Sequence, residues 1–182
     1  MAKVTLIDSN HLRLIINRLC YQLIENHDLF SNTVLIGLQP RGVFFAEKIV
    51  QNLKQIAPNT TVNFGKVDPT FYRDDFRRSD KTLLAQPTDI PFNLEGKRVV
   101  LIDDVLYTGR TIRAGLEGMM EYGRPQSIEL MVLIDRRFSR ELPIEPTYIG
   151  MSVDSYDNQK VKVMWKHEGA TDDKVLLLTE KE

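Results

Sequence analysis

The sequence contains a single cysteine, Cys20, in a chain of 182 residues. One cysteine excludes an intrachain disulfide, and Cys20 falls within a periodic apolar pattern that is typical of a buried helix face. We therefore expect Cys20 to be a core residue rather than a nucleophile. Because free thiols persist in a reducing compartment, the low cysteine content predicts a cytoplasmic protein.

Long apolar runs are also missing. No stretch approaches the length of a membrane span, and the first ten residues lack the apolar region of a signal peptide. The formal net charge of -1 provides no overall attraction to nucleic acid or to an anionic membrane surface. We therefore expect no membrane partner, and a nucleic-acid role would require a local basic patch.

Familiar metal and nucleotide motifs are absent as well. The three histidines have no metal-ligand spacing with Cys20, and the chain has neither a Gly-rich Rossmann fingerprint nor a Walker sequence. These absences argue against a structural metal and against an ordinary dinucleotide or ATP site. Each histidine is expected at the surface or at a helix cap.

What is present is an alternation of short apolar strands with amphipathic helices. After the possible cap residues Asp8, Ser9 and Asn10, apolar positions from Leu12 to Leu23 predict an opening helix. Strands are predicted at 33–38, 61–67, 97–103 and 127–135, helices at 41–56 and 110–123, and two final strands at 147–153 and 160–167. This order predicts one α/β domain over residues 1–182, with a parallel, doubly wound sheet and a small β-rich hood at about 135–182.

The stretch VVLIDDVLYTGRT, from Val99 to Thr111, places two aspartates after a buried strand. Ligands of open parallel sheets bind beyond the carboxyl ends of the strands. A carboxylate pair at such an end can accept hydrogen bonds from ribose hydroxyls, and the Thr-Gly-x-Thr turn presents N–H groups to a phosphate at a helix start. The stretch therefore predicts adjacent sugar and phosphate sites.

This stretch resembles the signature of type I phosphoribosyltransferases, which is a hydrophobic strand, two acidic residues and a Thr-Gly-x-Thr/Ser turn. The segments DDVLYTGRTIRAGLEGMMEYGRP, FYRDDF and RELPI are similar to the PyrR group of bifunctional pyrimidine-operon regulators and uracil phosphoribosyltransferases. The resemblance implies a type I phosphoribosyltransferase fold. It also implies that ribose 5-phosphate passes from phosphoribosyl pyrophosphate (PRPP) to N1 of uracil, giving UMP and pyrophosphate, with magnesium bound to the donor.

The resemblance extends to the donor site. It implies that Asp103 and Asp104 hold the ribose hydroxyls, and that Arg41 stabilises charge on the leaving pyrophosphate; these three residues are the catalytic candidates. The implied PRPP-binding residues are Pro40, Arg41, Gly42, Asp103, Asp104, Val105, Leu106, Tyr107, Thr108, Gly109, Arg110 and Thr111. Magnesium is expected through bound PRPP, with Asp103 and Asp104 as candidate protein ligands. The family usually has threonine where Pro40 stands.

The base site is implied by the segment that follows the last core strand. Asp135 and Arg136 match the family's Asp-Arg pair, and backbone near Val161 is expected to complete the uracil site. Purine-using relatives place a carboxylate where this chain has Tyr107, so the tyrosine favours a pyrimidine. The family's Gly-His pair is replaced by Arg137–Ser139, which is one residue longer.

A long charged segment at about 70–88 corresponds to the flexible loop that closes over the active site in this family. It contains Arg73, Arg77 and Arg78. Closure would exclude water from a reactive centre, although the sequence does not assign an essential role to any one arginine.

Two other functions remain open. One is a UMP-sensing, RNA-binding transcription attenuation regulator, with or without catalysis, and the other is a purine phosphoribosyltransferase. A panel of bases would separate them. The resemblance also suggests a homodimer or a dimer of dimers.

RNA binding is predicted to be weak. Glu145 and Met151 stand where regulatory members tend to be basic, and Asn17 and Tyr21 lie near positions that carry RNA-contacting residues in those members. Only Arg140 matches. Fewer cations mean fewer neutralised phosphates. The alternative is a replacement basic patch formed by Lys3, Arg13 and Arg18.

Overall fold

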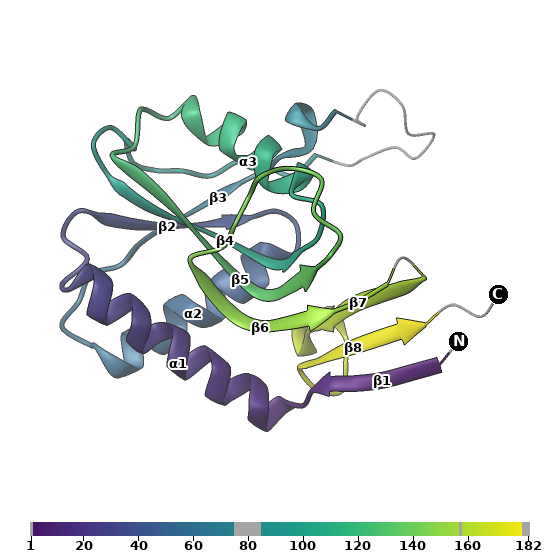
Figure 1. Ribbon diagram of the computed structural model, residues 1–182. Helices are drawn as coiled ribbons and strands as arrows, with labels where there is room; N and C mark the ends of the chain where they lie inside the picture. The colour runs from purple at the N-terminus through teal and green to yellow at the C-terminus, as the bar shows by residue number, and fades with distance from the viewer. Residues whose placement is uncertain (1, 75–84, 157, 180–182) are drawn as a thin grey trace.

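A five-stranded parallel sheet forms the centre of the molecule (Figure 1). The strands are β2 (Thr33–Leu38), β3 (Asn63–Val67), β4 (Arg98–Leu106), β5 (Ser127–Arg137) and β6 (Tyr148–Asp154). Their order is β3-β2-β4-β5-β6, and every neighbouring pair runs parallel. The computed structural model describes residues 2–74, 85–156 and 158–179. The predicted α/β class with a parallel sheet is confirmed.

Helices cover both faces of this sheet (Figure 1). They are α1 (Ser9–His27), α2 (Gly42–Ile56) and α3 (Arg110–Met120). Side chains alternate along β4, so that Val100 and Ile102 pack with α1 and α2, whereas Val99 and Leu101 pack with α3. Burial on both faces explains the continuous apolar run of this strand. Within the part of the chain that the structure describes, no helix is long and apolar enough to cross a bilayer.

A small antiparallel sheet forms the hood, and its membership differs from the prediction. It contains β1 (Ala2–Ile7), β7 (Gln159–Met164) and β8 (Lys174–Thr179) in the order β1-β8-β7; the short 3-10 helices are η1 (Thr70–Tyr72) and η2 (Lys166–Glu168). The strand at 148–154, predicted in the hood, instead pairs with β5 as a parallel edge strand. The connection at 138–147 contains no helix, so the sequence lacked the usual sign of a parallel crossover.

The end of α1 is tied to the sheet by a buried polar cluster. His27 Nδ1 lies 3.1 Å from Thr33 Oγ1, and its Nε2 lies 3.1 Å from Glu129 Oε2 and 3.0 Å from the Tyr148 hydroxyl. Burial lowers the pKa of His27, which favours a neutral ring. Because the Glu129 carboxylate only accepts, the ring donates from Nε2 and accepts at Nδ1. This histidine belongs to the interior, contrary to the expectation of a surface or cap position.

Replacing Tyr148 with phenylalanine is expected to lower the free energy of unfolding by about 1–3 kcal/mol. The buried Tyr148 hydroxyl donates to Glu129 Oε2 at 2.7 Å, so its loss leaves a partly buried carboxylate with one donor fewer. Denaturant unfolding measures the change, and Tyr156→Phe is the control because Tyr156 is 76% exposed. Equal stability of the two variants would contradict the prediction.

Candidate functional site

Asp103 and Asp104 lie inside β4, because this strand continues beyond them to Leu106. Both are buried, with relative exposures of 8% and 6%. The Asp103 carboxylate accepts a hydrogen bond from the backbone N–H of Asp104 at 2.8 Å. The rigid strand therefore fixes the backbone of both acidic residues near the carboxyl edge of the sheet.

The acidic pair lies in a largely desolvated place, which disfavours negative charge on both carboxyls. Burial, followed by the neighbouring Asp104 charge, raises the pKa of Asp103 well above its usual range. Burial also raises the pKa of Asp104, although the Arg41 guanidinium opposes this shift. Arg41 Nε donates to Asp104 Oδ2 at 3.0 Å. Such a site favours ligands that bring hydroxyl donors or a cation.

Magnesium fits this pair only as an ion shared with a ligand. Carboxylate oxygens are the hard donors that magnesium prefers, and protein sites often supply one or two carboxylates while substrate phosphates and water complete the octahedron. Among the described residues, no group of three or more His, Cys, Asp or Glu side chains could hold a metal ion. Asp103 and Asp104 are therefore the residues that could hold magnesium delivered with a phosphorylated ligand.

The turn after β4 surrounds a pocket of about 230 Å³, which we call the turn pocket. Its lining includes Asp103, Arg73 and the run Val105–Ile112. Gly109 precedes α3 with φ of 93°, a left-handed conformation that suits glycine. Because unsatisfied N–H groups at a helix start attract anions, the turn is suited to a phosphate.

The loop after β2 brings Arg41 and Gly42 against β4. A Cβ at Gly42 would lie 2.6 Å from the Ile102 carbonyl oxygen and 2.8 Å from Asp103 Cα. Only glycine permits this approach. The missing side chain at Gly42 therefore lets this loop pack against the strand that carries the acidic pair, while Pro40 is exposed in the same loop.

A second pocket of about 610 Å³, the hood pocket, lies between β4 and the small sheet. It is lined by Arg41, Asp104, Val105, Tyr107, Arg136, Lys160, Val161, Lys162, Val163 and Leu178. The Arg136 guanidinium lies 4.0 Å from the centre of the Tyr107 ring, and Arg136 also donates to Ser155 Oγ at 2.8 Å. Arg136 and Val161, two of the three residues expected in the base site, thus line one pocket.

Asp135 and Arg136 are neighbours in the sequence, but their side chains contact different residues. Its carboxylate accepts a hydrogen bond from Arg140, which also donates to the backbone carbonyl of Tyr107. Asp135 therefore positions Arg140 beside Tyr107. In the segment predicted to close over the site, Arg73 donates to Thr111 Oγ1 at 3.3 Å, whereas Arg77 and Arg78 lie outside the described residues.

The sequence did not indicate several residues of the hood pocket, namely Lys160, Lys162, Val163 and Leu178. Lys160 and Lys162 alternate with valines along β7, a signal that predicts a strand but not what it faces. Leu178 lies on β8, a strand that the sequence analysis did not identify. These residues reach the pocket only because the two sheets meet there.

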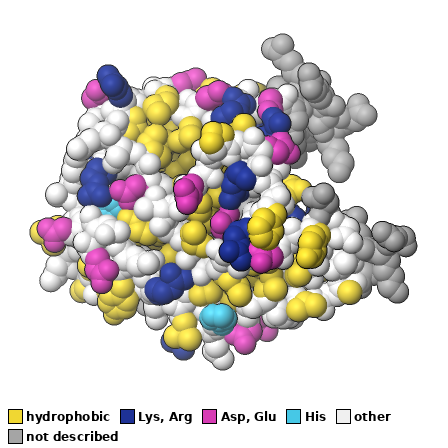
Figure 2. All heavy atoms as spheres, in the orientation of Figure 1, with side chains coloured by type: hydrophobic (Ala, Val, Ile, Leu, Met, Phe, Trp, Pro, Cys, Tyr) yellow, Lys and Arg dark blue, Asp and Glu magenta, His cyan; other side chains and the backbone are white. Residues whose placement is uncertain are grey.

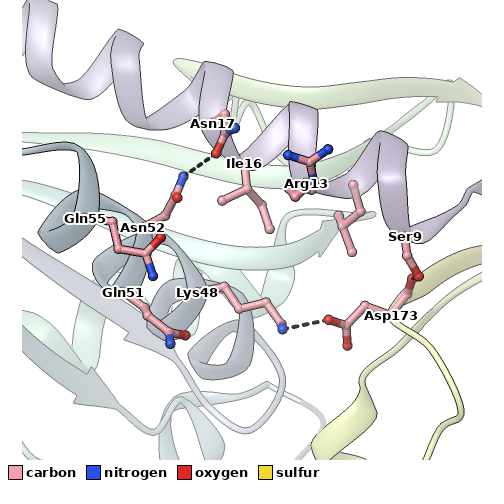
Figure 3. A pocket seen from close by; sticks show the side chains of 10 residues that line it. Ser9, Arg13, Ile16, Asn17, Lys48, Gln51, Asn52, Gln55 and Asp173 are labelled. Atoms are coloured by element: carbon pink, nitrogen blue, oxygen red, sulfur yellow. Dashed lines mark hydrogen bonds and ion pairs between the residues drawn. The ribbon is translucent and has the colours of Figure 1, made fainter.

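A third pocket, of about 350 Å³, lies between α1 and α2, away from these residues (Figure 3). Asn52 donates to Asn17 across it at 2.7 Å, and Lys48 pairs with Asp173 at its other end at 2.7 Å. None of the residues predicted for the donor site or the base site lines it. It is therefore separate from the acidic pair.

Comparison with known proteins identifies the family. The phosphoribosyl transferase domain family matches residues 5–168. Bifunctional protein PyrR of Latilactobacillus sakei is 41% identical over 177 residues, which cover 93% of this chain and 97% of that protein. Bifunctional protein PyrR of Bacillus subtilis is 39% identical over 163 residues, which cover 88% and 89%.

A solved structure supports the same fold. A hypoxanthine phosphoribosyltransferase from Staphylococcus aureus has a TM-score of 0.66 and 21% sequence identity, covering 87% of this chain and 80% of that chain. The sequence matches show the family, and the shared fold agrees with them. The chain therefore belongs to the phosphoribosyltransferase family and is an enzyme of its pentosyl-transferring class.

Proposed function

We propose that this enzyme is a uracil phosphoribosyltransferase, which transfers ribose 5-phosphate from PRPP to N1 of uracil and releases pyrophosphate. The observation that carries the proposal is a shared wall: Val105 and Tyr107 line both the turn pocket and the hood pocket. Asp103 lines the first pocket and Asp104 lines the second. A ribose held at the acidic pair would therefore have its phosphate on one side and the base on the other.

The proposed division of labour follows from the chemistry of each group. The Tyr107–Thr111 turn binds the 5-phosphate, Asp103 and Asp104 accept the ribose hydroxyls, and Arg41 binds the diphosphate. The bond from C1′ to N1 of uracil forms while the bond from C1′ to the pyrophosphate oxygen breaks, and the proton on N1 is released to solvent. Catalysis then depends on positioning and on stabilising charge that develops on the leaving group. Magnesium bound with the donor would neutralise part of that charge.

The preference for uracil is supported by the hood pocket. Tyr107 places a phenol where purine-using relatives have a carboxylate. The pocket therefore has a phenol in the place of the carboxylate that serves as a general base beside a purine ring. The Arg136 side chain covers the Tyr107 ring and is held by Ser155, which makes a rigid wall for a small planar base. The relatives are named PyrR, and resemblance to the PyrR group implies a pyrimidine substrate. A purine substrate is the alternative that a panel of bases tests.

A panel of bases tests the proposal. With PRPP and magnesium, uracil is expected to be converted to UMP, and hypoxanthine, guanine and xanthine are expected to react at least about tenfold more slowly, a difference of about 1.4 kcal/mol in the activation free energy. Chromatography of the nucleotide products measures this. PRPP with magnesium should also raise the unfolding temperature, because a ligand that binds only the folded state stabilises it. Turnover of a purine alone would overturn the base assignment.

RNA-dependent regulation is the second candidate, favoured by the bifunctional relatives. Two of the cations that could support it have other partners: Arg140 binds the Asp135 carboxylate, and Arg18 donates to the carbonyls of Ile149 and Gly150. On the face seen in Figure 2, basic and acidic side chains are interspersed. Both observations support the proposal that the chain acts first as an enzyme.

We expect a pyrimidine-operon leader RNA to bind with a Kd weaker than about 1 µM at physiological salt, in the range of non-specific binding. Fewer free cations release fewer counterions, so affinity should be low and insensitive to RNA sequence. A gel-shift titration with UMP and a scrambled RNA of equal length measures both properties. Nanomolar binding that discriminates between the two RNAs would contradict the prediction.

A further inference from the structure

Arg41 connects the central sheet to the hood. Its Nε donates to Asp104 at 3.0 Å, its Nη2 donates to the backbone carbonyl of Val163 at 2.5 Å, and its Nη1 lies 3.3 Å from a Glu168 oxygen. Each nitrogen of the guanidinium therefore has an acceptor. Arginine has five N–H donors, so a diphosphate can still approach Arg41, but it must compete with the Asp104 and Glu168 carboxylates for the positive charge of the guanidinium.

The three acceptors differ in how easily they can be displaced. Asp104 is buried inside β4, and the Val163 oxygen belongs to the backbone of β7. Glu168 is a flexible side chain, and its side chain is 33% exposed. Glu168 is thus the acceptor that a diphosphate would replace most easily, because water can solvate the released carboxylate.

Glu168 is held beside Arg41 by contacts outside the hood pocket. It ends η2, and the preceding residue, His167, packs edge-on against the Phe44 ring in the first turn of α2, with 4.3 Å between ring centres. The backbone N–H of Lys166 donates to Asp173 at 2.7 Å. These contacts fix the segment that carries the Glu168 carboxylate, so its negative charge stays near the guanidinium.

We propose that Glu168 is a positioning residue for Arg41: it holds the guanidinium between the acidic pair and the hood, competes with the diphosphate of the donor, and so weakens binding of PRPP and of pyrophosphate. This inference rests on the proposed function, since it assumes that Arg41 binds the diphosphate. The contact between Glu168 and Arg41 weakens binding of both the donor and the product, because both ligands present a diphosphate to Arg41. When a diphosphate binds Nη1, the Glu168 carboxylate is released from Arg41, while the Val163 carbonyl still accepts from Nη2 and holds the guanidinium against the hood.

Glu168→Gln tests the proposal because it retains shape but removes the charge. We expect the KM for PRPP and the Kd for magnesium pyrophosphate, measured by calorimetry without any base, to fall about threefold, as expected for loss of an exposed ion pair. The KM for uracil and kcat should change little. The fall in Kd should shrink as sodium chloride rises toward about 0.5 M, where surface charges are screened.

Two variants control the measurement. Glu168→Asp keeps the negative charge, so its Kd for magnesium pyrophosphate is expected to lie between those of the wild type and of Glu168→Gln. Glu47→Gln removes an exposed carboxylate that pairs with Lys66 at 2.7 Å, and it should leave pyrophosphate affinity unchanged. Unchanged or weaker pyrophosphate binding by Glu168→Gln would overturn the inference alone. Absence of PRPP and pyrophosphate binding by the wild type would overturn the proposed function as well.

Discussion

Asp104→Asn is expected to lower kcat/KM for PRPP by at least about tenfold, equal to about 1.4 kcal/mol in transition-state free energy. The amide keeps the shape and one acceptor oxygen, but it removes the charge that we propose attracts ribose hydroxyls and magnesium. It also deprives Arg41 Nε of its charged partner at 3.0 Å. Because Asp104 is buried, water cannot take the place of the lost charge as it would at a surface.

Initial rates at several PRPP concentrations measure this effect. Asp154→Asn is the matched control, because it also removes a carboxylate paired with an arginine, Arg137, at 2.6 Å, but on the exposed end of β6. The control is expected to retain wild-type kinetics. If Asp104→Asn kept both turnover and donor affinity, the assignment of the ribose site to the acidic pair would be wrong.

Gly42→Ala is expected to lower both stability and activity. The added Cβ would lie 2.8 Å from Asp103 Oδ1 and closer still to the Ile102 carbonyl oxygen, so α2 or β4 must shift. We expect a loss of about 1–3 kcal/mol in the free energy of unfolding, as for overpacking of a close contact. A shift of Asp103 or Arg41 should also lower kcat/KM by at least about tenfold, because catalysis by positioning is sensitive to small displacements.

A second glycine separates the two effects. Gly96 has φ of 67° with open space around its Cβ position, and it lies before β4, at the end of that strand opposite the acidic pair. Gly96→Ala should cost roughly 1 kcal/mol of stability through backbone strain and leave kcat/KM unchanged. Equal activity of Gly42→Ala and the wild type would show that the close approach has no role in positioning the site.

Local patterns in the sequence were sufficient for the sheet strands and for the turn that follows β4. The apolar run at Val99–Ile102 predicts a buried strand because residues on both faces of a covered parallel sheet must be apolar. Asp8 was a possible helix cap, and its carboxylate accepts the N–H of His11 at 2.8 Å. Such signals depend on neighbours within a few residues, so a linear pattern contains them.

The pairing of the hood strands and the His27 cluster could not be predicted in this way. β1 and β8 pair although they lie at opposite ends of the chain, and neither has a turn signal linking it to the other. His27 meets Tyr148 across 121 residues, in a place where α1 crosses the sheet. Spacing rules describe one element at a time and do not specify which distant elements become neighbours.

The sequence by itself determined the acidic pair, the turn that follows it and the alternation that makes a parallel sheet, because short-range periodicity and turn chemistry dictate these features. Tertiary structure alone decided that β6 joins this sheet, that β7 and β8 close the hood pocket, and that Arg41 meets Glu168 across 127 residues. Those contacts arise when separate apolar faces pack together, and packing depends on the whole set of surfaces to be buried.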